Sequence, residues 1–180
     1  MERAIGETGA IPPKAKALID ALGLIPHPEE GGWFRETWRA ADSIAGTALP
    51  GRYQGADRSH GTCIYYLLTP ETVSALHLLQ SDEIFHFYLG DPVEMLQLFP
   101  DGTTKMTVLG SDVFGGHVVQ HLVPQGVWQG SRLQPGGEVA LMGCSVAPGF
   151  DFADYTHGDR AALTKAYPKV AEAIAALTRE

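Results

Sequence analysis

Apolar residues along the chain first follow the spacing of a helix, then that of short strands, and then that of a helix again. In the first region a proline opens the segment, Gly23 follows it, and apolar side chains recur every three or four positions. These apolar positions are Ala15, Leu18, Ile19 and Leu22. The spacing and the flanking residues predict one short amphipathic helix at about residues 12–23.

Between about residues 31 and 150, short apolar segments are separated by turn-forming Gly, Pro, Asp and Ser residues. The segments fall at residues 33–38, 63–68, 73–80, 84–89, 93–99, 105–109, 117–123, 128–133 and 139–146. Such regular punctuation is typical of strands, and Pro100, Asp101 and Gly102 mark the clearest hairpin turn. We therefore expect an all-β core, an antiparallel sandwich or barrel of the jelly-roll kind.

The helical pattern returns after Gly149. Asp159 is a candidate N-cap for a helix over residues 160–167, and Pro168 begins a second helix. The C-terminal helices are thus expected at about residues 158–178. With no repeat or linker visible, we interpret residues 1–180 as a single domain whose β-barrel spans about residues 31–150. A loop at residues 42–61, rich in Gly, Ser, Asp and Arg, is long enough to be functional.

Composition and charge narrow the classes of partner. The 180 residues include 13 Lys and Arg against 21 Asp and Glu, a formal charge of −8 without a basic block. Nucleic acids and anionic membrane surfaces are therefore poor partners. The longest apolar segments fall far short of the roughly 20 residues that a membrane helix needs.

The expected compartment is the cytoplasm. Residues 1–7 lack the basic start and the apolar run of a signal peptide. The two cysteines, Cys63 and Cys144, lie far apart in apolar, strand-like segments. We interpret them as buried free thiols rather than as a disulfide.

The most informative polar residues are His77 and Glu83. On a strand, His77 shares a face with Ala75 and Leu79, while Glu83 shares a face with Phe85, Phe87 and Leu89. If both faces point into the barrel, the two side chains converge. An imidazole and a carboxylate in an apolar cavity either bind a metal or form an acid/base pair with shifted pKa values. The alternative is a structural histidine bonded to a carboxylate, and both interpretations stay open.

Four further residues are candidates for ligand binding. Trp33 and Trp128 would form an aromatic wall at the mouth of the barrel, suited to a sugar or another ring, and their alternative is a place in the core. Arg35 either pairs with residues across the sheet, beside Glu36, or clamps an anionic ligand. Gln120 and His121 take opposite faces of one strand, so only one can enter a pocket, and Gln120 is our candidate.

Two motifs resemble those of the cupin superfamily of small β-barrels. Glu83 and Gly90 match the E-x6-G end of the first cupin motif, and His77 stands near its first histidine. In the second motif, residues 124–126 match P-x-G, and Gln129 replaces the histidine. The resemblance thus implies His77, Glu83 and Gln129 as a metal-ligand set. Because a carboxamide is a weak ligand, we expect no required cofactor and at most a weakly bound divalent metal.

A closer resemblance covers nearly the whole chain. Residues 24–38, 81–92, 123–129 and 145–155 are similar to the largely uncharacterised cupin family described as predicted sugar epimerases. One departure is Glu30, which follows Glu29 where the family commonly has a single acidic residue. The resemblance implies a cupin double-stranded β-helix with short terminal helices, a homodimer, and a small polar organic ligand in the barrel. His86 and Tyr88, which alternate with Glu83, are interpreted as packing or dimer-interface residues.

The same resemblance implies a reaction. In nucleotide-sugar epimerases of the dehydrorhamnose 3,5-epimerase type, a histidine on a barrel strand removes a proton next to a ketone and a carboxylate orients it. Residues 75–77 resemble that strand, so His77 is the expected base and Glu83 the orienting carboxylate. The expected activity is isomerisation or epimerisation of a carbohydrate-like carbonyl compound. Two alternatives stay open, a non-catalytic small-molecule binding protein and a metal-dependent cupin enzyme.

Overall fold

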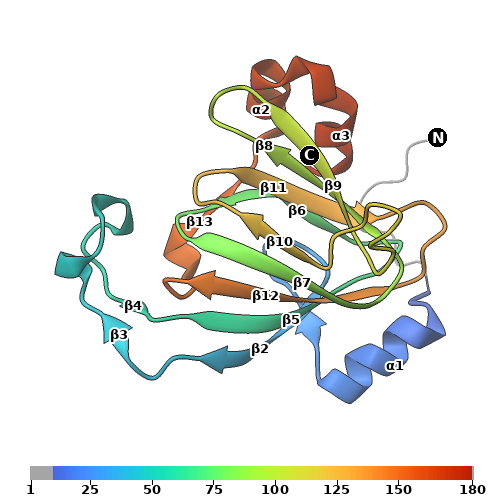
Figure 1. Ribbon diagram of the computed structural model, residues 1–180, viewed down its shortest axis with the longest axis horizontal. Helices are drawn as coiled ribbons and strands as arrows, with labels where there is room; N and C mark the ends of the chain where they lie inside the picture. The colour runs from blue at the N-terminus through green and yellow to red at the C-terminus, as the bar shows by residue number, and fades with distance from the viewer. Residues whose placement is uncertain (1–9, 180) are drawn as a thin grey trace.

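Two antiparallel sheets face each other in the computed structural model, which describes residues 10–179 (Figure 1). One sheet has the order β1 (Ile25–Pro26), β2 (Trp33–Arg39), β5 (Thr62–Leu68), β12 (Ala140–Ala147), β7 (Asp82–Gly90) and β10 (Gln120–Val123). The other has the order β13 (Tyr155–His157), β6 (Val73–Leu79), β11 (Trp128–Leu133), β8 (Val93–Leu98) and β9 (Thr104–Leu109). Residues 1–7, which lack a signal-peptide pattern, lie outside the described range.

The main core lies between the two sheets. Tyr66, Phe85 and Met142 come from the first sheet, Met95 and Leu133 come from the second, and all five side chains are buried. Side chains alternate between the two faces of a strand, so each strand places every second residue in this core. Burying one such side chain contributes about 1.5–3 kcal/mol to folding. The expected β core is confirmed.

Helices cover parts of the outer faces of both sheets. The first, α1 (Pro13–Leu22), ends at Gly23 in the left-handed conformation and packs Ala15 and Ile19 against Leu67. At the other end of the chain lie α2 (Arg160–Ala166), the short 3-10 helix η4 (Pro168–Val170) and α3 (Ala171–Ala176). Leu163 and Ile174 of these helices pack on Leu76 of β6. The helices predicted at both ends of the chain are confirmed.

The long loop at residues 42–61 is structured. It contains the small hairpin of β3 (Ser43–Ile44) and β4 (Arg58–Ser59), with the 3-10 helices η1 (Gly46–Ala48) and η2 (Gly51–Tyr53) between them. Arg58 is buried and forms two 2.7 Å hydrogen bonds with the carboxylate of Asp154. Asp154 ends the 3-10 helix η3 (Phe152–Asp154), so this ion pair joins the hairpin to the segment after β12.

The predicted strand at residues 117–123 begins only at Gln120. Residues 117–119 cross from one sheet to the other, because Val118 donates a backbone hydrogen bond to Val108 on β9 while Val119 accepts one from Phe87 on β7. A segment that connects two sheets cannot form a continuous ladder with either of them.

The prediction that Leu89 shares the inward face of Glu83 is wrong. β12 pairs Met142 with Phe87 and the preceding Leu141 with Leu89, so Tyr88 is an extra residue on β7. Such a β-bulge reverses the facing of the residues that follow it. Phe87 is 9% exposed and faces the core, whereas Leu89 is 39% exposed.

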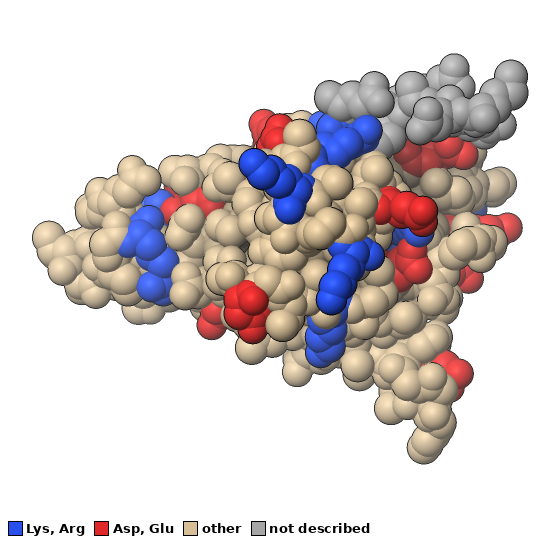
Figure 2. Space-filling model, turned by 90° about the horizontal axis from the view of Figure 1, so that it is seen from above, with Lys and Arg blue, Asp and Glu red and all other residues tan. Residues whose placement is uncertain are grey.

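The surface carries charges of both signs. Figure 2 shows Lys and Arg side chains interspersed with Asp and Glu over the face that is seen from above. None of the helices within residues 10–179 combines the length and the apolar character that a bilayer crossing requires.

Candidate active site

A cavity of about 240 Å³ opens beside strands β2, β5, β7 and β12. Most of its wall is apolar, with the side chains of Phe34, Ile64, Leu79, Val146, Phe150 and Phe152. Four carboxyl groups interrupt this surface, those of Glu30, Glu36, Glu83 and Asp151. An apolar cavity with a few polar groups converging on it is the usual form of a small-molecule site.

The carboxyl group of Glu83 is buried in the cavity wall. β7 directs it inward, and the side-chain amide of Gln129 on β11 donates a 2.6 Å hydrogen bond to its Oε2. Burial, followed by the negative charge of Glu30, raises the pKa of Glu83 to about 7, against the lowering effects of His77 and Gln129. Near neutral pH this carboxyl group can both take up and release a proton.

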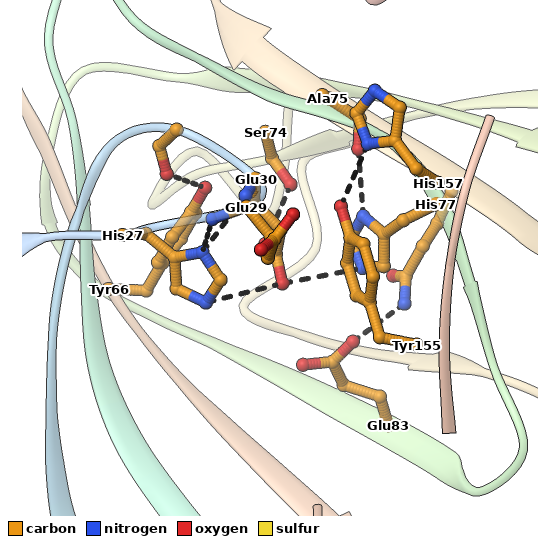
Figure 3. A network of polar contacts seen from close by, with 12 residues as sticks. His27, Glu29, Glu30, Tyr66, Ser74, Ala75, His77, Glu83, Tyr155 and His157 are labelled. Atoms are coloured by element: carbon orange, nitrogen blue, oxygen red, sulfur yellow. Dashed lines mark hydrogen bonds and ion pairs between the residues drawn. The ribbon is translucent and has the colours of Figure 1, made fainter. Parts of the chain in front are cut away.

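The carboxyl group of Glu30, whose side chain is 13% exposed, lies between two imidazole rings (Figure 3). Nε2 of His27 and Nε2 of His77 each lie 3.7 Å from its Oε1, and Ser74 donates a 3.2 Å hydrogen bond to its Oε2. Burial raises the pKa of Glu30, and the nearby His27 and the bond from Ser74 oppose this shift.

The hydrogen bonds assign the protons on the two rings. Nδ1 of His27 accepts a 2.9 Å bond from the backbone N–H of Glu30, so a neutral His27 carries its proton on Nε2. Nδ1 of His77 donates to the carbonyl of Ala75 across 2.8 Å, which leaves a lone pair on its Nε2. Burial lowers the pKa of both rings. Nε2 of His77 thus faces Glu30 Oε1 at 3.7 Å, a distance beyond that of a direct hydrogen bond.

A tight loop places Glu30 in this position. Gly31 has φ 96°, and a Cβ atom there would lie 2.5 Å from the carbonyl oxygen of Val73. Only glycine adopts this conformation at such a close approach without strain. The backbone carbonyl of Glu30 accepts a 2.9 Å bond from Ala75, which fastens the loop to β6.

The structure brings three of the predicted site residues together. His77 and Gln129 are paired across β6 and β11, and Gln129 bonds Glu83. His77, however, is 1% exposed, stacks on Tyr155 with ring centroids 5.2 Å apart, and directs Nε2 at Glu30 rather than into the cavity. His77 is therefore placed to interact with Glu30 and not with a ligand in the cavity.

The other four predicted ligand-binding residues lie away from the cavity. Phe34 and Glu36 face it from β2, so the alternation directs Trp33 and Arg35 to the opposite side. There Trp33 packs beside α1, and the guanidinium of Arg35 lies 5.6 Å from the ring of Tyr65.

Trp128 and Gln120 also face away from the cavity, because side chains alternate along their strands. Trp128 packs with the C-terminal helices, because its neighbour Gln129 takes the inward position. Gln120 bonds His86 on the outer face across 3.3 Å, and it is His121 that points inward to Gln97. None of these four side chains is among the described residues that line this cavity.

Glu30 and His27 are site residues that the sequence patterns do not single out. In the sequence, the second acidic residue before the paired glycines stands out only as a departure from the family pattern. Position in a loop gives no periodic signal, although two glycines directly after Glu30 do indicate a backbone that turns sharply there.

The predicted metal-ligand set does not fit a metal centre. The amide nitrogen of Gln129 faces Glu83, and Nε2 of His77 faces Glu30, so the three donor groups do not converge. Within residues 10–179, no group of three or more His, Cys, Asp or Glu side chains is arranged to hold a metal ion.

Comparisons with known proteins place the chain among relatives of similar length. A family model described as Cupin superfamily (DUF985) matches residues 16–158. An uncharacterised protein of Saccharomyces cerevisiae is 34% identical over 153 residues, which are 81% of this chain and 75% of that protein. A hypothetical protein from Leishmania major is 31% identical, with a TM-score of 0.82 over 92% of this chain and 99% of that chain. A Shewanella oneidensis protein is 32% identical, with a TM-score of 0.80 over 92% and 97% of the two chains.

A more distant likeness concerns the fold alone. Oxalate decarboxylase from Bacillus subtilis is 14% identical, with a TM-score of 0.51 over 87% of this chain and 38% of that chain. The expected cupin fold is confirmed by this likeness and by the family match. The chain belongs to the uncharacterised DUF985 family of the cupin superfamily.

Proposed function

We propose that the chain is an isomerase or epimerase that moves a proton next to the carbonyl group of a small, carbohydrate-like compound. The observation that carries this proposal is a pair of carboxyl groups in the wall of one cavity, the buried Glu83 and the largely buried Glu30. Burial raises the pKa of both groups, and that of Glu83 is about 7. Two carboxyl groups with shifted pKa values are suited to serve as acid and base in one reaction.

The two carboxyl groups take complementary roles. Ionised Glu83 removes the proton from the carbon next to the carbonyl, and the electron pair of that C–H bond moves toward the carbonyl oxygen. Protonated Glu30 then returns a proton to the carbon, and the carbonyl re-forms. When the proton returns to the opposite face, the centre is inverted.

His77 acts through Glu30 rather than on the substrate. Its Nε2 lone pair faces Glu30 Oε1 at 3.7 Å, so the lone pair favours the protonated form of Glu30 and orients it. Gln129 orients Glu83 through its 2.6 Å hydrogen bond. The base expected at His77 thus becomes a positioning residue, and the two carboxyl groups contact the substrate.

Solvent exchange tests the reaction even when the product is unidentified. Reducing sugars and keto sugars are incubated with the protein in D2O, and deuterium at the carbon next to the carbonyl is followed by NMR. We expect incorporation with the wild type and its loss in Glu83→Gln and Glu30→Gln. Glu71→Gln, in an exposed turn, is the matched control and should keep the activity.

The same experiment separates an enzyme from a passive binding protein. A sugar that binds, as shown by a shift in melting temperature, but exchanges no proton would contradict the proposed reaction. Exchange that persists in both carboxamide variants would reject the roles given to Glu30 and Glu83.

Two further expectations belong to this proposal. A homodimer would cover apolar side chains on the outer face of the first sheet, such as Tyr88 and Leu122, which are 52% and 50% exposed. Light scattering on the purified protein measures its oligomeric state directly.

The cytoplasmic location stays a prediction, to be tested by fractionation.

A further inference from the structure

The charges in the cavity wall are unevenly balanced. Among the described residues that line the cavity, four carry carboxyl groups and Arg39 alone carries a guanidinium group. The imidazole of His27 does not supply a further positive charge, because burial lowers its pKa. The wall therefore holds more acidic than basic groups, although Glu36 is paired with Arg39 and the raised pKa values of Glu30 and Glu83 favour their neutral forms.

The guanidinium of Arg39 is already hydrogen-bonded to groups of the protein itself. Its Nε and Nη2 donate to the two carboxylate oxygens of Glu36 across 3.1 and 2.7 Å, and its Nη1 donates to the carbonyl of Phe150 across 3.1 Å. This fork uses the geometry with which a guanidinium would otherwise bind a phosphate or a carboxylate. A ligand with an anionic group would have to displace Glu36 and approach the remaining carboxylates.

Aromatic rings stand beside these carboxyl groups. Phe150 and Phe152 meet nearly at right angles, with centroids 5.0 Å apart, and both line the cavity. Phe34 lies in the same wall and contacts the ring of His27, with centroids 4.6 Å apart. Aromatic faces close to carboxylates are a recurring means of recognising an ammonium group.

The size of the cavity limits the ligand. Its volume of about 240 Å³ is below the range of about 300–1,000 Å³ found for pockets that hold drug-sized molecules. A monosaccharide-sized ligand suits this space, whereas a nucleotide diphosphate sugar is much larger and carries two negative charges.

From these contacts we propose that the cavity selects a small amine in its ammonium form, an amino-substituted carbohydrate-like compound, over neutral and anionic relatives. This inference rests on the proposed function for the class of compound and adds the charge of the ligand. The carboxylates of Asp151 and Glu83 attract the ammonium, whose charge favours the ionised form of Glu83 that the reaction uses, and the phenyl rings cover its carbon skeleton.

Matched ligands test the selectivity. Calorimetric titrations with glucosamine, N-acetylglucosamine, glucose and glucose 6-phosphate are run at about pH 6.5, where an amine with a pKa near 8 is protonated. We expect glucosamine to bind at least about tenfold more tightly than glucose and N-acetylglucosamine, and glucose 6-phosphate to bind most weakly. A missing affinity for glucosamine, equal affinities, or a preference for the phosphate would each overturn the proposal.

A substitution at Glu36 provides a second test. Glu36→Gln leaves the guanidinium of Arg39 without its carboxylate partner, so the preference for glucosamine over glucose 6-phosphate should fall about tenfold. Glu71→Gln, the same chemical change at an exposed turn, should leave the preference unaltered. An unaltered preference in Glu36→Gln would also contradict the proposal.

The two proposals fail separately. Selective glucosamine binding without deuterium exchange would reject the proposed reaction and keep the amine site. Exchange in neutral sugars without any preference for glucosamine would reject the amine site and keep the reaction.

Discussion

Nε2 of His77 lies 3.7 Å from Oε1 of Glu30, on the edge of the ring opposite to the bond that Nδ1 makes with Ala75. A histidine on a barrel strand is thereby directed at a carboxyl group rather than at a ligand. Glu30 becomes the group that reaches the cavity, while His77 is held behind it. The acid/base chemistry of the site then depends on two carboxyl groups and on what surrounds each of them.

The raised pKa of Glu83 predicts a pH-dependent stability. Its pKa rises from 4.5 to about 7 on folding, so between these values the folded protein holds a proton that the unfolded chain has released. The resulting contribution is complete below about pH 4.5 and is lost as the pH rises through about 7. Relative to the wild type, Glu83→Gln should therefore gain stability as the pH increases over this window.

Urea unfolding at a series of pH values measures this difference. Glu71→Gln, at an exposed position, should show no comparable trend. A difference between Glu83→Gln and the wild type that does not vary with pH would contradict the expectation.

Gln129 is expected to lower the pKa of Glu83. Gln129→Met keeps the length of the side chain but removes the amide that donates to the carboxylate at 2.6 Å. The pKa of Glu83 should then rise above its wild-type value, as measured by NMR of the carboxyl carbon. Gln97→Met is the matched control, since Gln97 bonds His121 instead. An unchanged or lower pKa in Gln129→Met would reject this role.

The buried pair of Arg58 and Asp154 should be important for stability. Arg58→Met leaves the carboxylate of Asp154, which is 4% exposed, without its partner, and we expect a loss of about 3–5 kcal/mol in unfolding free energy. The double variant with Asp154→Leu should recover much of this loss. Lys16→Met breaks an exposed ion pair with Asp20 and should cost less than about 1 kcal/mol. Similar losses in Arg58→Met and Lys16→Met would contradict the importance given to the buried pair.

Two glycines with similar backbone angles should respond differently to alanine. Gly31 and Gly102 have φ of 96° and 85°, but an added Cβ meets the Val73 carbonyl at 2.5 Å only in Gly31, whereas Gly102 faces open space. Gly102→Ala should cost about 1–2 kcal/mol from the left-handed backbone alone. Gly31→Ala should cost more and should also weaken solvent exchange, because the loop that holds Glu30 must shift. Equal thermal stability of the two variants would disprove this expectation.

Local patterns in the amino-acid sequence are enough to define the elements and much of their order. Proline and Gly23 delimit α1 at the residues expected, and Asp159 caps α2 as predicted, accepting a 2.7 Å bond from Ala162. The strand at Trp128–Leu133 has the bounds that its apolar pattern predicts. Caps, turns and apolar periods act between residues a few positions apart, so they can be read without the fold. The convergence of His77 and Glu83 is predicted from strand alternation, and the motif resemblance adds Gln129.

Which side chains reach the cavity depends on contacts between distant segments. Alternation relates the residues within one strand, but it does not say which of the two faces is buried, so the expected positions of Trp33, Arg35, Trp128 and Gln120 are on the wrong side. The bulge at Tyr88 changes the face of Leu89 for a reason that pairing with β12 alone reveals. Glu30 sits in a loop without any period, and its burial comes from contacts with β6, more than forty positions along the chain. Long-range packing of this kind leaves no pattern in the residues around it.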